Sequence, residues 1–402
     1  MDRRQFLAAG GFAAGSFVSA LPSLAAVPDA GPGAAIGNGP DLDLDLNPGL
    51  ALFKRVDFTS DGLGLDPAEY TTLLQQTVAG GRLVADNYSR GGEIGRLEQT
   101  FADLLGKQAA MFVPTGTLAN HLAVRTLAAE RPRVLVQAES HLYNDSGDCA
   151  QTLSGLNLVP LAEGRSTIGL DEVKRWVERS AGGRVKTPVG VISIENPVRR
   201  RDHQMVDFDE LQRVCAYARE HGIALHLDGA RMFNLPLHSG RSLKEHAGLF
   251  DTVYVSLWKH FNGASGAILA GDQAFIDGLF HARRMFGGSL PHAWPQIGLV
   301  AQYVRTYEDD YARAWRAADR LIALLQADPR VQVDRLPGGT SRFMLTVRGI
   351  PPERLAARAW DGGIGLASGD PDTGALNMQV NPTLLRVPVE KVAATLLTAL
   401  DS

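Results

Sequence analysis

Two charged residues that follow apolar runs stand out in the middle of the chain. Asp228 comes after an apolar run that begins at Gly222, and a Gly-Ala turn and Arg231 follow it. Lys259 comes after the next apolar run, which begins at Thr252. A carboxylate can keep a ring nitrogen protonated, and an amine can form a Schiff base with an aldehyde. Pyridoxal phosphate needs this pair of groups, so the sequence predicts an enzyme that uses this cofactor.

A third motif, Thr115-Gly116-Thr117, lies between a predicted strand at Ala109–Val113 and a predicted helix at Leu118–Ala129. Backbone amides at a helix N-terminus bind phosphate well. An ordinary helix cap would explain the motif equally well if it stood alone. Ligands bind beyond the carboxyl ends of the strands in open parallel sheets, and Asp228 and Lys259 also follow strands. We therefore expect all three motifs to meet at one edge of a sheet and to form the cofactor site.

The elements that must position these motifs alternate along the chain from Val56 to about Pro291. Short apolar runs alternate with helical periods, which predicts an α/β fold with a mainly parallel sheet covered by helices. The remaining predicted strands are Val134–Gln137, Gly190–Ile194, Ala224–Leu227, Thr252–Leu257 and Gly266–Ala270, and the remaining helices are Asp171–Arg179 and Phe208–His221.

A smaller C-terminal α/β domain is expected after this sheet. It would follow a long helical segment at 300–328 and contain strands at Arg342–Val347 and Leu376–Val380 and a last helix from Val389. The predicted organisation is a signal peptide at 1–26, a linker or arm at 27–55, a large domain at 56–300 and a small domain at 301–402.

The N-terminus resembles an export signal. Arg3–Leu7 has a twin-arginine pattern, an apolar Gly/Ala-rich stretch runs to Ala20, and Ser23–Ala26 offers small residues for cleavage. This pattern predicts twin-arginine export to the periplasm, with no membrane anchor after the signal is cleaved.

Composition limits the possible partners. The chain has 402 residues, 21% of them charged, and a formal net charge of −4. Basic residues do not alternate with aromatic residues, so a nucleic-acid partner is not expected. We also expect no metal site. The two cysteines, Cys149 and Cys215, could pair in an oxidising periplasm, but buried free thiols are expected, because Cys215 lies in an amphipathic helical pattern.

Several stretches together resemble the threonine aldolase and β-eliminating lyase superfamily of fold-type I pyridoxal phosphate enzymes. The resemblance runs from about Val56 to Gly288 and is weaker after that. The similar stretches are Val56–Asp61, Gly92–Glu98, Leu105–Asn120, Ser140–Tyr143, Ser193–Asn196, His226–Arg231 and Arg283–Gly288.

The resemblance implies a role for each site residue. Lys259 would carry the cofactor, Asp228 would pair with its ring nitrogen, and His141 would lie over the ring and act as the catalytic base. Thr115, Gly116 and Thr117 would hold the phosphate. The substrate would be bound by Arg231, with Ser60 and Glu195 as further contacts. Tyr88 aligns with a family tyrosine near the cofactor, whereas a purely structural role is expected for His226.

Three departures from the family pattern concern the substrate side of the site. Pro197 and Val198 stand where the family usually has Thr-His, and His203 does not align with that histidine. Pro291-His292 replaces an Arg-Gln pair. Asn377 or Met378 falls where a second carboxylate-binding arginine is expected, and Arg386 lies some residues away. The side-chain pocket and part of the carboxylate site are therefore expected to differ from those of the family.

Three functions are compatible with these residues. The first is an aldolase that cleaves β-hydroxy-α-amino acids, threonine or a bulkier analogue, to glycine and an aldehyde. The second is another reaction on the same scaffold, such as β-elimination or racemisation. The third is a binding protein without turnover, although binding alone needs neither Lys259 nor Asp228. The resemblance also implies a homodimer or homotetramer, in which Arg283 or Arg284 could reach a neighbour's phosphate. A position on a solvated helix surface would explain both arginines at least as well.

Overall fold

The computed structural model describes residues 55–81 and 83–401. The predicted signal peptide and all of the predicted arm except Arg55 lie outside the described residues. Export therefore stays a prediction.

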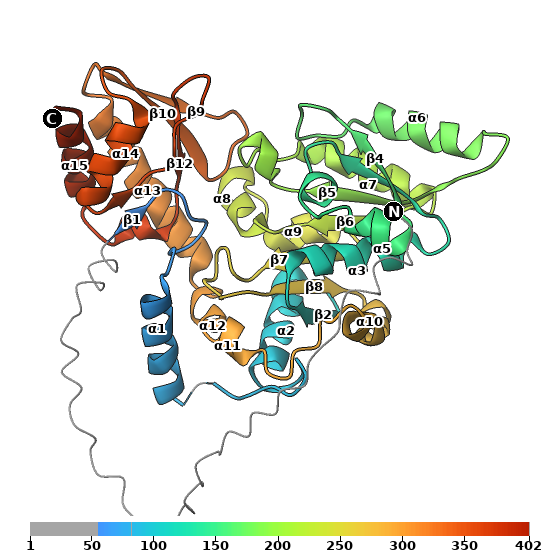
Figure 1. Cartoon of the computed structure of the whole chain (residues 1–402). Helices are drawn as coiled ribbons and strands as arrows, with labels where there is room; N and C mark the ends of the chain where they lie inside the picture. The colour runs from blue at the N-terminus through green and yellow to red at the C-terminus, as the bar shows by residue number, and fades with distance from the viewer. Residues whose placement is uncertain (1–54, 82, 402) are drawn as a thin grey trace, which may run out of the picture. The chain divides into compact units, whose positions relative to one another are not determined.

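A seven-stranded sheet forms the centre of the predicted large domain (Figure 1), with the strand order β2-β8-β7-β6-β5-β3-β4. Strand β8 is antiparallel to both of its neighbours, and the other six strands run in the same direction. The mainly parallel sheet is thus confirmed. The strands are β2 (Ala109–Val113), β3 (Arg133–Gln137), β4 (Asn157–Leu161), β5 (Val189–Glu195), β6 (Ala224–Asp228), β7 (Thr252–Ser256) and β8 (Ala267–Gly271).

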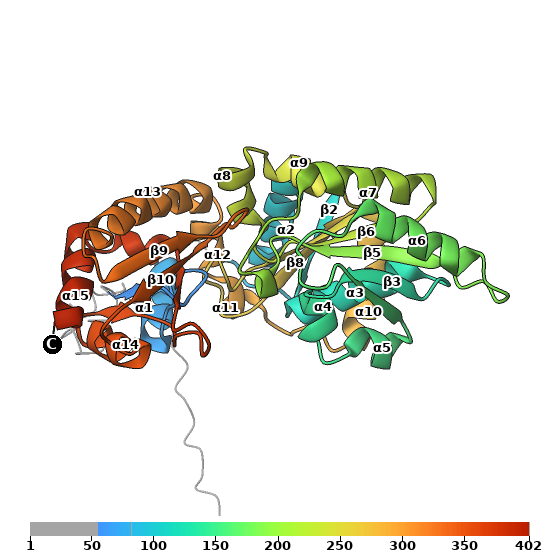
Figure 2. The same cartoon turned by 90° about the horizontal axis from the view of Figure 1, so that it is seen from above.

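Helices cover both faces of this sheet. Figure 2 shows α7 and α9 on one face and α3, α5 and α10 on the other. The helices of this part are α1 (Pro67–Ala79), α2 (Gly92–Leu105), α3 (Gly116–Ala128), α4 (His141–Asn144), α5 (Cys149–Ser154), α6 (Leu170–Ala181), η2 (Arg199–Arg201), α7 (Phe208–Glu220), η3 (Met232–Asn234), α8 (Leu235–Ser239), α9 (Leu243–Gly248), α10 (Gln273–Met285), α11 (Trp294–Ile297) and α12 (Val300–Tyr303).

Burial explains why the central strands were readable from the sequence. All seven residues of β5 are buried, as expected for a strand covered on both faces. Apolar residues can fill every position of such a strand, so a polar residue at its end stands out. Glu195 and Asp228, which end β5 and β6, are the polar ends of two such runs.

The C-terminal part contains an antiparallel three-stranded sheet with the order β12-β10-β9. The short strand β1 (Val56–Asp57) pairs in parallel with β11, so the start of the predicted large domain is hydrogen-bonded to the C-terminal part. The elements are α13 (Tyr307–Leu325), β9 (Val331–Arg335), β10 (Arg342–Val347), α14 (Pro352–Asp361), β11 (Ile364–Gly365), β12 (Leu376–Gln379), η4 (Pro382–Leu385) and α15 (Val389–Asp401).

The single long helical segment predicted for residues 300–328 is wrong in one respect. Helix α12 ends at Tyr303, and α13 begins at Tyr307. Three acidic residues, Glu308, Asp309 and Asp310, lie in the first turn of α13. Negative charge stabilises a helix N-terminus, which favours a new start at this point over continuation.

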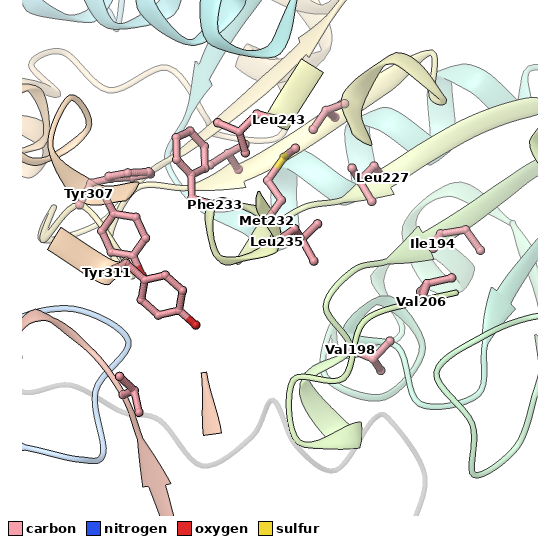
Figure 3. Close-up of a cluster of buried hydrophobic side chains, with 14 of the residues drawn as sticks. Ile194, Val198, Val206, Leu227, Met232, Phe233, Leu235, Leu243, Tyr307 and Tyr311 are labelled. Atoms are coloured by element: carbon pink, nitrogen blue, oxygen red, sulfur yellow. The ribbon is translucent and has the colours of Figure 1, made fainter. Parts of the chain in front are cut away.

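One apolar cluster continues from the sheet to the C-terminal part (Figure 3). Met232, Phe233 and Leu235 lie between Leu227 of β6 and Tyr307 of α13, and all five side chains are buried. The segment that follows Asp228 is therefore held firmly by packing.

Two further findings concern the described residues. None of the helices in 55–81 and 83–401 is long and apolar enough to cross a bilayer.

Both cysteines are free, as predicted, but Cys149 is only partly buried. Burial raises the pKa of the Cys215 thiol to about 12, so this thiol is unreactive at neutral pH.

Candidate active site

The carboxyl edge of the sheet brings the predicted motifs together. Glu195 of β5 and Asp228 of β6 are partners in the strand register, and Asp228 is the partner of Tyr254 in β7. A cavity of about 240 Å³ opens at this edge. Its lining includes His141, Glu195, Asp228, Arg231, Tyr254 and Lys259. Six residues from widely separated segments thus surround one cavity.

Asp228 is fixed by a buried chain of hydrogen bonds. Its Oδ2 accepts from Asn120 Nδ2 at 2.6 Å, and its Oδ1 accepts from the backbone N–H of Ala230 at 3.1 Å. The Asn120 Oδ1 lies 2.9 Å from His226 Nε2, and His226 Nδ1 lies 2.8 Å from Thr252 Oγ1. Because the Asn120 amide nitrogen serves Asp228, its oxygen must accept the proton of His226 Nε2. Asp228 is therefore held in one orientation.

This chain of hydrogen bonds agrees with the structural role expected for His226. Both of its ring nitrogens are occupied, and burial lowers its pKa to about 4, so the ring is neutral at pH 7. The sequence reading did not identify Asn120. A polar residue on the buried face of α3, four positions after Gly116, was the available signal.

Lys259 lies at the wall of the same cavity. Its Nζ is 3.5 Å from Ser256 Oγ and 4.3 Å from the centre of the Trp258 ring. Burial, followed by the charge of Arg231, lowers the pKa of Lys259 to about 8. The next residue, His260, stacks on Tyr307 with ring centres 4.4 Å apart, which fixes the backbone beside the lysine.

The lowered pKa of Lys259 predicts how its reactivity depends on pH. Only the neutral amine attacks an aldehyde, so the rate of pyridoxal phosphate uptake by cofactor-free protein should rise about tenfold per pH unit below pH 8. The rate should level off above that pH. Stopped-flow absorbance would measure it, with Nα-acetyl-lysine as the unburied control. A rate that still rises tenfold per unit at pH 9.5 would contradict the lowered pKa.

His141 begins α4 and is held by Glu195. The backbone N–H of His141 donates to Glu195 Oε2 at 2.6 Å, and the ring Nδ1 lies 3.3 Å from Ser146 Oγ. The ring Nε2 makes no hydrogen bond with any described residue. Burial lowers the pKa of His141, even though Asp228 opposes the shift. A neutral imidazole with a free Nε2 therefore faces the cavity.

Glu195 is occupied by two backbone partners. Its second oxygen, Oε1, accepts from the backbone N–H of Arg199 at 2.9 Å. Burial, followed by the nearby charge of Asp228, raises its pKa to about 7. These contacts give Glu195 a positioning role for His141, and its predicted contact with the substrate stays a prediction.

The Thr115-Gly116-Thr117 motif begins α3. Thr115 is the N-cap, and its side chain accepts from the backbone N–H of Leu118 at 3.2 Å. A Cβ on Gly116 would lie 1.9 Å from Tyr254 Oη, and Tyr254 lines the cavity. Only glycine therefore lets this helix start approach the site. The first amides of a helix have no partner within it, so this cradle fits the phosphate of the cofactor.

Arg231 has a largely buried carboxylate partner that could not be identified from the sequence. Its Nε and Nη2 donate to the two carboxylate oxygens of Asp61 at 2.7 and 2.8 Å. Burial alone would raise the pKa of Asp61, but the charge and hydrogen bonds of Arg231 outweigh burial and lower it. Arg231 Nη1 has no acceptor among the described residues. The Oγ of Ser60 donates to Asp57 Oδ2 at 2.5 Å, so its predicted contact with the substrate stays a prediction.

A second and larger cavity adjoins the first. It has a volume of about 720 Å³ and shares Arg231, Trp258 and Lys259 with the smaller cavity. Most of the remaining wall comes from residues 59–71, including Leu65 and Tyr70. This cavity offers space for a ligand next to the amine of Lys259.

Two residues predicted to reach a neighbour differ in exposure. The side chain of Arg283 is buried, and its Nη1 donates to the backbone oxygen of Phe112 at 2.7 Å. Arg283 therefore cannot reach another subunit, whereas the exposed Arg284 is placed to do so.

Tyr88, predicted to lie near the cofactor, has a side chain that is 46% exposed. In the single chain it does not contribute to the cavity wall.

Comparisons with known proteins agree with this geometry. Residues 69–381 match the family model described as β-eliminating lyase. A low-specificity L-threonine aldolase of Saccharomyces cerevisiae is 32% identical over 210 residues, which is 52% of each chain. An alanine racemase of Cochliobolus carbonum is 27% identical over 238 residues, 59% of each chain. The chain spans about half the length of the first curated relatives it matches.

A solved structure covers more of the chain. The crystal structure of a putative L-allo-threonine aldolase from Listeria monocytogenes is 26% identical and has a TM-score of 0.72. The match covers 88% of this chain and 97% of that one.

Proposed function

Because this chain belongs to the β-eliminating lyase family, we propose that it is a pyridoxal phosphate-dependent aldolase that cleaves β-hydroxy-α-amino acids to glycine and an aldehyde. The observation that carries the proposal is the convergence of Asp228, Lys259 and a free His141 Nε2 on one cavity. An electron sink needs the first two groups, and a hydroxyl base needs the third.

The residues present fit the cofactor. Lys259 would hold it through the amine, Asp228 would face its ring nitrogen, and the first amides of α3 would bind its phosphate. When bound, pyridoxal phosphate supplies a sink for the electron pair of the bond that breaks at Cα. The fixed carboxylate of Asp228 would keep the ring nitrogen protonated and so maintain that sink.

His141 and Arg231 act on the substrate itself. Arg231 Nη1 would bind the substrate carboxylate, while Asp61 holds the Nε and Nη2 edge of the guanidinium. His141 Nε2 takes the proton of the β-hydroxyl, directly or through a water molecule, as the Cα–Cβ bond breaks and the aldehyde forms. Cα then gains a proton, which completes glycine. The lowered pKa of His141 keeps its ring in the neutral form that a base requires.

The larger cavity supports a substrate bulkier than threonine. Its volume of about 720 Å³ far exceeds the space that a methyl group needs, and Trp258, Leu65 and Tyr70 contribute apolar surface to its wall. Trp258 lines both cavities, at the point where the Cβ substituent would leave the reacting centre. We therefore place the β-substituent in the larger cavity and expect aryl or long alkyl groups to be preferred.

The direct test is product identification with purified mature protein and pyridoxal phosphate. Threonine and β-phenylserine would be supplied as the small and the bulky substrate, and glycine and the aldehyde would be quantified. Glycine with equimolar aldehyde supports the proposal, and a higher kcat/KM for β-phenylserine supports the assignment of the larger cavity. A 2-keto acid as the product, or no product, would refute the aldolase.

Racemisation is the second candidate, because one matched relative is an alanine racemase. The absence of a second histidine after Glu195-Asn196 is consistent with it, since racemisation needs no base at a hydroxyl. Loss of optical rotation by L-alanine, without release of glycine, would select this function.

Replacing His141 with alanine should separate its two expected roles. Loss of a general base should lower kcat with β-hydroxy substrates by about 10²–10⁴-fold. Cofactor affinity, measured by fluorescence titration, should change much less. His121→Ala provides a control, because this histidine is hydrogen-bonded to Ser154 and does not line the cavity. A large loss of cofactor affinity with little loss of kcat would restrict His141 to a stacking role.

Localisation and assembly also belong to this proposal. The twin-arginine pattern at Arg3–Leu7 supports export of the folded protein to the periplasm. The exposed Tyr88 and Arg284, whose guanidinium lies 5.4 Å from the Tyr88 ring centre, support a homodimer or homotetramer in which this surface meets a second copy. Cell fractionation and light scattering would test the two statements.

A further inference from the structure

A partly buried chain of hydrogen bonds connects Arg231 to the C-terminal three-stranded sheet. Asp61 Oδ1, which accepts from Arg231 Nε, also accepts from Gln379 Nε2 at 2.7 Å. Gln379 Oε1 in turn accepts from Arg342 Nε at 3.0 Å. Arg342 and Gln379 are register partners on the paired strands β10 and β12. The guanidinium groups of Arg231, after β6, and of Arg342, on β10, are thus linked through one largely buried carboxylate and one amide.

The second guanidinium is only partly satisfied. Arg342 Nη1 donates to Asp202 Oδ1 at 3.2 Å, and the Asp202 side chain is 47% exposed, so this ion pair is weak. Arg342 Nη2 has no acceptor in the described part of the chain. The Arg342 side chain is 22% exposed, and burial followed by the charge of Arg231 lowers its pKa. The two cations therefore act on each other, and a further anion would relieve their repulsion.

A buried histidine in the same region has a free nitrogen. His203 is fully buried, its Nδ1 lies 2.7 Å from Ser341 Oγ, and its Nε2 has no hydrogen-bond partner. Thr340 donates twice to the backbone oxygen of His203, from its N–H at 3.1 Å and its Oγ1 at 2.9 Å. The loop that follows Asn196 is therefore fastened to the start of β10, directly before Arg342, and this attachment fixes the Arg342 backbone.

We infer that Arg342 is the second cation of the substrate-carboxylate site, so that a carboxylate bound by Arg231 Nη1 is also held by a guanidinium from β10. This inference rests on the proposed function. It assigns the contribution of the small domain to β10, whereas Asn377 occupies the position on β12 where an arginine was expected. Asn377 Nδ2 donates to the same Asp202 Oδ1 at 3.1 Å, so side chains at 342 and 377 reach a common point.

The test compares two ligands that differ by one carboxylate. Glycine and methylamine would be titrated into the protein loaded with pyridoxal phosphate, and binding would be followed by the cofactor absorbance. Arg342→Gln should lower the affinity for glycine about 10- to 100-fold, which is the range for losing a charged hydrogen bond. The affinity for methylamine should stay the same. Arg348→Gln is the matched control, since Arg348 is exposed just beyond the end of the same strand.

Two further variants keep the inference testable if Arg342→Gln does not fold. Arg342→Lys keeps the positive charge but cannot donate the two parallel hydrogen bonds of a guanidinium. It should therefore lower the affinity for glycine about tenfold and leave the affinity for methylamine unchanged. The double variant Arg342→Gln/Asn377→Arg should recover most of the glycine affinity, because position 377 reaches the same point.

The outcomes are distinguishable. If the unchanged protein discriminates glycine from methylamine and the Arg342 variants do so equally well, the inference is overturned. Equal losses of affinity for glycine and methylamine would give Arg342 a purely structural role and would also overturn the inference. If the unchanged protein does not respond to glycine at all, the proposed function fails, and this inference fails with it.

Discussion

Replacing Lys259 with alanine should abolish the visible absorbance that pyridoxal phosphate acquires on binding and lower turnover roughly 10⁴-fold. Among the described residues 55–81 and 83–401, Lys259 is the only lysine that lines the 240 Å³ cavity. Because the pKa of Lys259 is about 8, a substantial fraction of its amine is uncharged at neutral pH, whereas an exposed lysine is almost fully protonated. Absorbance spectra and steady-state kinetics on the purified variant would measure both effects.

Two controls separate chemistry from folding in the Lys259 experiment. Lys259→Arg keeps the positive charge and much of the volume but cannot condense with an aldehyde, so it should behave like Lys259→Ala. Lys244→Ala removes an exposed lysine and should change neither measurement. An unchanged spectrum in Lys259→Ala would show that another residue holds the cofactor.

Replacing Asp228 with alanine should lower kcat/KM roughly 10³-fold, because an opposite charge at close range raises the pKa of a ring nitrogen by up to about three units. Without that charge, the unprotonated ring is a poor electron sink. The pH dependence of the bound cofactor spectrum would report the ring-nitrogen pKa directly, and kinetics would report the loss in rate.

Asp228→Asn distinguishes charge from packing. Asparagine matches the shape of the carboxylate but carries no charge, so its activity should fall nearly as far as that of Asp228→Ala. Activity close to that of the unchanged protein in Asp228→Asn would mean that Asp228 serves only to hold the Asn120 and Ala230 segments.

Much of the fold and the centre of the site could be predicted from the sequence. Strands β2 and β10 have the predicted bounds, and the other predicted strands differ by one residue at one or both ends. Asp228 and Lys259 were identifiable because buried parallel strands are mostly apolar, so a charge at the end of β6 or shortly after β7 is conspicuous. Their convergence followed from the common direction of the strands.

The contacts that orient these residues could not be predicted in the same way. The Asp61–Arg231 and Asn120–Asp228 bonds each join residues more than 100 positions apart in the chain. Spacing along the sequence carries no information about such pairs when each partner is a common polar residue. Arg342 was missed for the same reason: its importance comes from the strand pairing of β10 with β12.

The walls of the two cavities differ in how many segments of the chain contribute to them. This difference determines how easily mutations can change the substrate preference. The smaller cavity is built from segments spread between His141 and Lys259, so altering it disturbs several elements at once. Most of the larger cavity comes from the single stretch 59–71. A mutational library restricted to Leu65, Tyr70 and Thr71 would leave Asp228 and its supports untouched. Substitutions within this one short stretch can therefore change the substrate preference, in evolution or by engineering, while the catalytic residues stay the same.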